Sequence, residues 1–246
     1  MRTCGRLAAS LAAALLVGSG ALAEDPRPYR EPPAVARDRA GIFDYYLLSL
    51  SWSPSYCAVA GGVRGDPQCA RRFAFVLHGL WPQFERGWPQ DCQSPDRGYV
   101  PFRIAVGMRD IMPSDRLVFH TYRKHGTCSG LGVDGYFALA RRLYEKIAIP
   151  ARFRNLVDER YMISPGDLIG EFLASNPDLR SDMIAVSCAG PGHRLREVRI
   201  CFDKGGNFRA CGANENQRRL CSAARMYVPP LRLSHTPGLS GPREEP

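Results

Sequence analysis

Four stretches of the chain have the apolar patterns that are typical of β-strands. Phe43 to Trp52 is rich in aromatic and aliphatic residues and ends at a Ser-Pro step, as a buried strand does. Arg72 to Leu77 predicts a second strand, which runs into a His-Gly step. Met183 to Ser187 and Leu195 to Phe202 alternate in the way that half-buried strands alternate. These stretches predict the strands of a sheet.

Two further stretches show helical spacing. Asp134 to Ile147 places its apolar residues on one face, with Asp134 as the capping residue. Ser164 opens a second helix, which continues through Ala174 and has proline at its first position. Because strands and helices are mixed without a regular βαβ alternation, the pattern favours an α+β fold.

The two ends of the chain differ in composition from the rest. Residues 1–23 combine a short basic start, an apolar Ala-rich run and a small-x-small step, which predicts a removable signal peptide. Residues 24–41 and 229–246 are rich in proline, and we interpret them as a flexible lead-in and a loose tail around one domain, residues 42–228. The apolar run is short for a membrane span. We therefore expect a secreted or periplasmic protein with no membrane attachment in its mature form.

Cysteine usage agrees with export. A three-residue loop centred on Gly206 would set Cys201 opposite Cys211, which suits a disulfide across a hairpin. The nearest two cysteines are 10 residues apart, so a zinc cluster of cysteines is disfavoured. An even number of cysteines in an exported chain indicates four disulfides. Removal of the first 23 residues leaves eight: Cys57, Cys69, Cys92, Cys128, Cys188, Cys201, Cys211 and Cys221.

The chain is also basic. Lys and Arg outnumber Asp and Glu by 33 to 24, and removal of Arg2 and Arg6 with the signal peptide leaves a net charge of +7. This balance favours a polyanionic partner such as nucleic acid or anionic lipid.

The candidate chemistry lies in three histidines and a lysine. His78 stands where a predicted strand enters a glycine-containing turn, a place where a sheet presents side chains to a cleft. A helix further along would place His120 and Lys124 one turn apart on one face, and Thr121 and His125 on a second. Imidazoles titrate near neutral pH, so two of them can serve as base and acid in one reaction. The added ammonium suits a substrate that brings negative charge.

Other interpretations stay open at this point. Each histidine taken singly is an ordinary structural or surface residue. Together, His78, His120 and His125 could hold zinc, but Lys124 beside them would repel the ion, and no carboxylate stands near in sequence to orient the rings. The residues alone favour a basic exported hydrolase acting on phosphate esters without a metal or cofactor.

Two motifs resemble the active-site segments of the ribonuclease T2 family. They are FVLHGLWPQ at residues 75–83 and KHGTC at residues 124–128, and the histidine of the first lies 46 residues before the lysine of the second. Leu47 to Cys57 is similar to the family's first core strand, and the resemblance covers roughly residues 43–221. It implies an α+β fold with a central, mainly antiparallel sheet flanked by helices. It also implies a metal-independent endoribonuclease that cleaves single-stranded RNA through a 2′,3′-cyclic phosphate with low base specificity.

The resemblance further implies roles for individual residues. His125 matches the general base that takes the 2′-hydroxyl proton, and His78 matches the general acid that protonates the departing 5′-oxygen. Lys124 and His120 match the groups that hold the phosphate and stabilise its transition state. Trp81 matches an aromatic residue of a base pocket, with a core role as the alternative. The implied disulfides are Cys57–Cys69, Cys92–Cys128, Cys188–Cys221 and Cys201–Cys211.

One position departs from the family pattern. The family's second segment usually reads His-Glu-aromatic-x-Lys-His-Gly, and here Thr121 stands at the glutamate position. A threonine there can hydrogen-bond but cannot carry charge, so we place it among the substrate-binding residues. We favour an active, monomeric enzyme whose partner is single-stranded RNA. The alternatives are that another acid, such as Asp115 or Glu85, fills the gap, or that the chain is a catalytically weakened RNA-binding or cytotoxic protein on the same fold.

Overall fold

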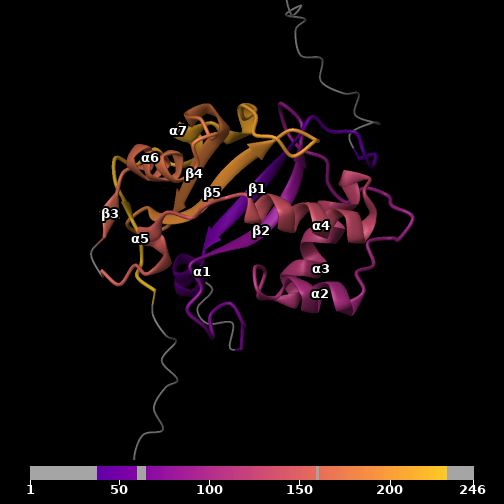
Figure 1. Cartoon of the computed structure of the whole chain (residues 1–246), viewed down its shortest axis with the longest axis horizontal. Coiled ribbons are helices and arrows are strands. Elements are labelled where there is room, and N and C mark those ends of the chain that lie inside the picture. Colours follow the sequence, from indigo (N-terminus) through magenta and orange to yellow (C-terminus); the bar gives the residue numbers. More distant parts are fainter. Residues whose placement is uncertain (1–37, 60–64, 159–160, 232–246) are drawn as a thin grey trace, which may run out of the picture. The chain divides into compact units, whose positions relative to one another are not determined.

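The computed structural model describes residues 38–59, 65–158 and 161–231 (Figure 1). The expected signal peptide, most of the expected lead-in and the expected tail from residue 232 onward lie outside the described residues. Within the described ranges, no helix has the length and hydrophobicity of a bilayer-crossing segment.

A four-stranded antiparallel sheet lies at the centre of the described chain (Figure 1). The strands are β1 (Tyr45–Trp52), β2 (Phe75–Gln83), β3 (Met162–Ile163), β4 (Ile184–Ala189), β5 (Arg194–Phe202) and β6 (Met226–Tyr227). The order in the main sheet is β2-β1-β5-β4, and β3 pairs with β6 in a separate two-stranded sheet. β1 therefore has one neighbour that follows it in sequence and one that comes from far along the chain.

Helices pack at both edges of the main sheet. They are α1 (Ser53–Val59), α2 (Phe102–Met108), α3 (Asp115–Lys124), α4 (Gly132–Glu145), α5 (Ala151–Arg154), α6 (Pro165–Ser175) and α7 (Gln217–Leu220), with short 3₁₀ turns at Gly126–Ser129, Ser181–Met183 and Ala213–Glu215. α4 contacts β1 and β2, α3 contacts β2, and α2 packs on α3 and α4. α6 and α7 contact β4 at the other edge. The predicted α+β fold is confirmed.

Alternate residues of β1 face opposite sides of the sheet. The even-numbered residues from Tyr46 to Trp52 are buried in the main hydrophobic core. The odd-numbered residues face the other side, where a second, small apolar cluster is followed by Ser49 and Ser51. Ser49 lies opposite Arg199 and Ser51 lies opposite Glu197 on β5. This second face carries the candidate site.

A β-bulge in β2 turns His78 toward the same face. Leu77 pairs with Leu50, and Gly79 pairs with Ser49, so His78 is an extra residue without a counterpart on β1. Leu77 points into the main core, so the residue after it points to the other side of the sheet. Bulges of this kind re-aim a side chain, and here the bulge keeps His78 and Gly79 on one face.

β2 is longer than the sequence predicts. The strand expected over residues 72–77 begins at Phe75 and continues through Gln83. The continuation includes Pro82, which is tolerated because β2 is an edge strand and proline need not donate a hydrogen bond there. His78 therefore lies within a strand and not at its end.

The two predicted helices are present, with one change of cap. The helix expected over residues 134–147 begins earlier, at Gly132, so that Asp134 lies in its first turn and is not the capping residue. Ser164 caps α6 as predicted, because its Oγ accepts a hydrogen bond from the backbone N–H of Asp167 at 3.0 Å. The predicted cap is therefore confirmed in α6 and wrong in α4.

Four disulfides join the pairs that the family resemblance implies: Cys57–Cys69, Cys92–Cys128, Cys188–Cys221 and Cys201–Cys211. The hairpin after β5 nevertheless differs in register from the expectation. Phe202 lies opposite Phe208, so Cys201 lies opposite Arg209 and not opposite Cys211, which is two residues further along. The loop is longer than expected because the carboxylate of Asp203 and its backbone both bond across it.

Both described ends of the domain are bonded to its interior. The backbone N–H of Gly41 donates to the carbonyl of Cys128 at 2.9 Å. At the other end, the indole N–H of Trp52 donates to the carbonyl of Pro229 at 2.9 Å, and residues 229–231 are buried. The bonded part of the chain thus extends past both expected boundaries of the domain.

Candidate active site

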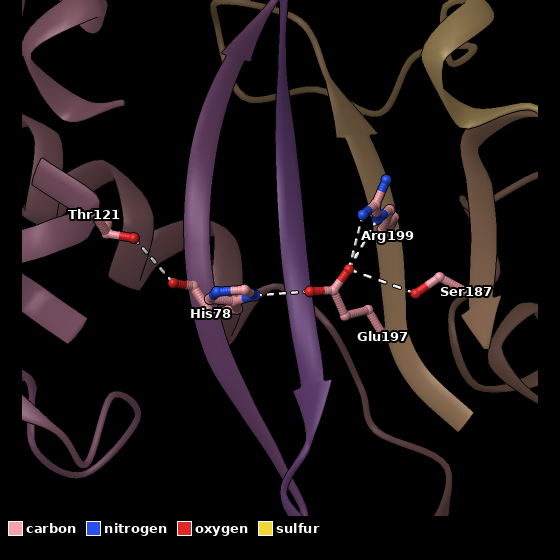
Figure 2. A network of polar contacts seen from close by, with 5 residues as sticks. All are labelled: His78, Thr121, Ser187, Glu197 and Arg199. Carbon is pink, nitrogen blue, oxygen red and sulfur yellow. Dashed lines mark hydrogen bonds and ion pairs between the residues drawn. The ribbon is translucent and has the colours of Figure 1, made fainter. Parts of the chain in front are cut away.

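His78 contacts a carboxylate from a distant part of the chain (Figure 2). Its Nδ1 lies 2.7 Å from Oε1 of Glu197, which belongs to β5 on the far side of β1. The small side chains of Ser49 and Ser51 on the intervening strand leave room for this contact. The His78 side chain is 33% exposed and that of Glu197 is 2% exposed, so the ring is accessible from solvent while its anchor is buried.

Several groups hold the carboxylate of Glu197 in place (Figure 2). Arg199 donates from Nε and Nη2 to Oε2 at 3.0 and 2.9 Å, and Oγ of Ser187 lies 3.5 Å from the same oxygen. Burial acts to raise the pKa of this carboxyl group, but the hydrogen bond and charge of His78, together with Arg199, outweigh burial and lower the pKa to about 2. Glu197 is therefore ionised across the neutral and mildly acidic range.

The other candidate residues lie on α3 or directly after it. α3 buries one face, which includes Thr121, and leaves His120 exposed and Lys124 partly exposed. His125 follows the last helical residue, and its backbone N–H donates to the carbonyl of Thr121 at 2.9 Å. The helix thus places His120 one turn from Lys124 and Thr121 one turn from His125.

The chain after His125 is held close to α3. Gly126 makes this possible, because a Cβ at that position would lie 2.3 Å from Cδ2 of Tyr122. The following turn carries Cys128, which is joined to Cys92 by a disulfide. Packing and a covalent bond therefore both limit the movement of the segment that bears His125.

Thr121 links α3 to β2. It is buried at 2% exposure, and its Oγ1 donates to the backbone carbonyl of His78 at 3.1 Å (Figure 2). Gly79 allows this approach, because a Cβ there would lie 2.9 Å from Oγ1 of Thr121 and 2.4 Å from Nε1 of Trp81. Thr121 thus holds the main chain at His78, while Glu197 holds its ring.

Trp81 packs against both histidines. The centroid of its ring is 5.1 Å from that of His78 and 5.2 Å from that of His125. The guanidinium carbon of Arg199 lies 5.7 Å from the same ring. The indole Nε1 is buried and has no hydrogen-bond partner among the described residues. The indole therefore joins β2, β5 and the end of α3 in one cluster.

His125 is in an environment opposite to that of His78. Burial, followed by the charges of Lys124, His78 and His120, lowers the pKa of its imidazole to about 3. Its Nδ1 is buried and lacks a hydrogen-bond partner in the part of the chain that the structure describes. One imidazole is thus bound to a carboxylate and the other is kept neutral, a division suited to acid and base roles.

The two acids considered for the missing glutamate are engaged elsewhere. Asp115 accepts hydrogen bonds from Arg109 at 2.8 and 2.7 Å, and Glu85 accepts one from Arg209 at 2.6 Å. The acid that does reach a histidine is Glu197, which sequence reasoning missed. A glutamate within an alternating apolar strand was the available signal, but the sequence does not tell which strand becomes its neighbour.

The described residues contain one cluster of potential metal ligands, Cys201, Cys211 and Glu215. Its two sulfurs are joined in a disulfide, and Glu215 accepts a hydrogen bond from the hydroxyl of Tyr45. The histidines on β2 and α3 are not part of this cluster.

Comparisons with known proteins place this arrangement in a family. A sequence model of the Ribonuclease T2 family matches residues 43–211. A ribonuclease of Aeromonas hydrophila is 34% identical over 205 residues, which are 78% of this chain and 86% of that protein. Ribonuclease I of Escherichia coli (strain K12) is 26% identical over 242 residues, covering 81% of this chain and 87% of that protein.

Solved structures show the same fold. The RNase-related protein from Calystegia sepium matches with a TM-score of 0.60 at 21% identity, covering 77% of this chain and 98% of that one. Ribonuclease MC1 from bitter gourd seeds matches with a TM-score of 0.58 at 19% identity, covering 75% and 99%. Since the family model covers more than half of the sequence and the relative from Aeromonas hydrophila spans most of both chains, the chain belongs to the ribonuclease T2 family.

Proposed function

We propose that this protein is an endoribonuclease that cleaves single-stranded RNA by transesterification, without a metal ion and with low base specificity. The observation that carries the proposal is the pair of imidazoles packed against Trp81, one bound to a carboxylate and the other held neutral. Attack by a ribose hydroxyl on its own phosphodiester needs one base and one acid, so it uses both. The positive charges of Lys124, next to His125, and of Arg199, bonded to the Glu197 carboxylate, oppose the binding of a divalent cation.

His125 is the base in this proposal. It takes the proton of the 2′-hydroxyl as the 2′-oxygen forms a bond to phosphorus. In the free protein, burial and then the charges of neighbours such as Lys124 lower the pKa of its imidazole and weaken its affinity for a proton. A bound phosphodiester brings negative charge that offsets them, so substrate binding itself strengthens the base.

His78 is the acid. It gives a proton to the 5′-oxygen as the bond from that oxygen to phosphorus breaks. The products are a 2′,3′-cyclic phosphate and a free 5′-hydroxyl, and the enzyme ends with the proton on His125 instead of His78. Because the nucleophile belongs to the ribose, DNA binds but is not cut.

Lys124 and His120 supply positive charge to the phosphoryl oxygens, which gain charge in the transition state. Both side chains reach solvent from neighbouring turns of α3. Trp81 is only partly buried, and we assign its accessible part to contact with a base. Thr121 contributes through the backbone of His78, and its neutral hydroxyl replaces the family's charged side chain without removing either histidine.

Single-stranded RNA is the proposed partner of a monomeric enzyme. Structures of ribonuclease MC1 variants are complexes with 5′-UMP and 5′-GMP, which supports nucleotide binding by this fold. The net charge of the chain favours RNA, and we expect binding to weaken as salt rises. Four disulfides suit an oxidising compartment, so we propose that residues 1–23 direct the chain to the periplasm or the exterior.

Incubation of the oxidised protein with single-stranded RNA and matched DNA in EDTA tests the function. His78→Ala and His125→Ala run beside wild type, and His193→Ala, in an exposed turn, is the matched control. We expect cleavage of RNA alone, with cyclic-phosphate ends, that is lost in the first two variants and kept in the third. RNA that is retarded in a gel but stays intact from pH 4 to 8 would support the weakened RNA-binding protein instead.

A further inference from the structure

We propose that Glu197 is a positioning residue for the general acid: it holds the His78 ring through Nδ1, so that Nε2 is the nitrogen that meets the leaving 5′-oxygen. The inference rests on the function proposed above. It adds a residue of β5 to a site whose other members lie on β2 and α3. Neither motif that carries the family resemblance contains this glutamate, which lies 119 residues after His78.

The sheet is built to bring these two side chains together. The bulge in β2 turns His78 to the second face, where β1 presents the small side chains of Ser49 and Ser51 next to it. Glu197 stands on that face opposite Ser51, and its carboxylate crosses the gap to Nδ1 at 2.7 Å. Larger side chains on β1 would fill this space, so the contact depends on all three strands.

The carboxylate is fixed and ionised. Arg199 donates two hydrogen bonds to its second oxygen, which leaves Oε1 free for the imidazole. The low pKa of Glu197 means that the group accepts hydrogen bonds and does not donate them. Nδ1 of His78 therefore carries a hydrogen in both the neutral and the protonated ring. Nε2 has no hydrogen-bond partner among the described protein groups, and it is the nitrogen that gains and loses the transferred proton.

Glu197 also supplies the negative charge that a protonated imidazole needs here. The charged and titratable groups near the two histidines are Lys124, His120 and His125 from α3 and its end, Arg199 from β5, and Tyr56, Arg194 and Arg196, which line the same pocket as His78 and Glu197. The positive charges of Lys124 and the arginines oppose a positive charge on His78, whereas His125 is neutral. Glu197 is the carboxylate that the described structure places against the ring, so its charge offsets these cations.

The experiment compares Glu197→Gln with wild type on two esters of the same nucleotide. One is uridylyl-3′,5′-adenosine, whose leaving alkoxide needs a proton, and the other is uridine 3′-(4-nitrophenyl phosphate), whose leaving phenoxide does not. General acid catalysis contributes about 10²–10⁴-fold, and loss of the positioning residue forfeits part of it. We expect kcat/KM to fall about 10–100-fold on the dinucleotide and by less than about threefold on the nitrophenyl ester. The ratio of the two values is unaffected by any fraction of the variant that is unfolded.

Four further proteins complete the design. His78→Ala should show the same selective loss, only larger, and His125→Ala should lose activity on both esters. The double variant His78→Ala, Glu197→Gln should be no worse than His78→Ala, because two residues that act as a unit are not additive. Glu171→Gln is the matched control. It removes the ion pair, at 3.2 Å, between Glu171 of α6 and Arg152 of α5, and the rates on both esters should be unchanged.

The pH dependence of kcat/KM is a second measurement, and it should not change if Glu197 only stabilises the fold. Without the anion, a protonated His78 is less favourable, so the alkaline limb of kcat/KM on the dinucleotide should move to lower pH in Glu197→Gln. Equal losses on the two esters, or wild-type rates on both, would overturn the role of Glu197 while leaving His78 as the acid. Full dinucleotide activity in His78→Ala is a different result, which overturns the proposed mechanism itself and this inference with it.

Discussion

Replacement of Gly79 by alanine tests whether the close approach of α3 to β2 sets the geometry of the two histidines. The added Cβ would lie 2.4 Å from Nε1 and 3.1 Å from Cδ1 of Trp81, and 2.9 Å from Oγ1 of Thr121. Carbon atoms in favourable contact are about 3.5–4.0 Å apart, so the indole must move by about 1 Å. The indole is a rigid ring that packs against both His78 and His125, so a shift of this size disturbs its contact with at least one histidine.

We expect two separate losses in Gly79→Ala. Overpacking of this kind lowers the free energy of unfolding by about 1–3 kcal/mol. A displacement of about 1 Å at a reacting group lowers the rate by on the order of 10²-fold, and kcat on single-stranded RNA should fall by that factor. Urea unfolding with the disulfides intact measures the first loss, and initial rates measure the second.

Gly170→Ala is the matched control. Gly170 lies within α6, and a Cβ there would meet nothing within 4 Å. Alanine is favoured over glycine in a helix by about 0.5–1 kcal/mol, so this variant should be slightly more stable and equally active. Wild-type stability and rate in Gly79→Ala would refute the reasoning, because Trp81 would then move freely without disturbing the site.

Three further changes have expected outcomes. Thr121→Val removes the hydroxyl that donates to the His78 carbonyl, so stability should fall by about 1 kcal/mol and kcat should drop, whereas Thr121→Ser should keep both in unfolding and rate measurements. The folded pKa of His125 is lowered from 6.5 to about 3, so the unfolded chain binds the extra proton and stability is lost as the pH falls from 6.5 toward 3. Urea unfolding at a series of pH values should show a smaller acid loss in His125→Asn, and an identical loss would contradict the burial argument. Serine at both Cys92 and Cys128 removes a disulfide that joins residues 36 positions apart, so the free energy of unfolding should fall by about 3–4 kcal/mol in thermal or urea unfolding. Activity per folded molecule should also fall. Equal activity per folded molecule would show that the disulfide does not hold His125 in place.

The helical part of the site could be predicted because the information is local. Residues four apart on a helix share a face, so the order His120, Thr121, Lys124, His125 already determines which side chains are neighbours. The structure adds how α3 is seated. Thr121 is buried against the carbonyl of His78, a contact with a strand that no helical pattern contains.

Of the site residues on strands, only those inside the sequence motif around His78 could be predicted. The sequence identifies His78 as a candidate but predicts the strand to end before it, because a bulge at the edge of a sheet leaves no periodic signal. Glu197 was missed for a related reason. Its position opposite Ser51 depends on β5 lying next to β1, a pairing between segments far apart in the chain. Alternation within each strand gives the face but not the neighbour.

The disulfide between Cys92 and Cys128 has a consequence for the cell that makes this protein. An enzyme that cuts RNA threatens the messenger RNA from which it is translated. The turn after His125 is secured by a bond that forms only where thiols are oxidised. We expect a newly synthesised chain to be harmless until that bond closes, and the paired serine variant above measures how much activity the open form retains. Formation of this disulfide would then delay RNA cleavage until the chain has been synthesised and has reached an oxidising compartment.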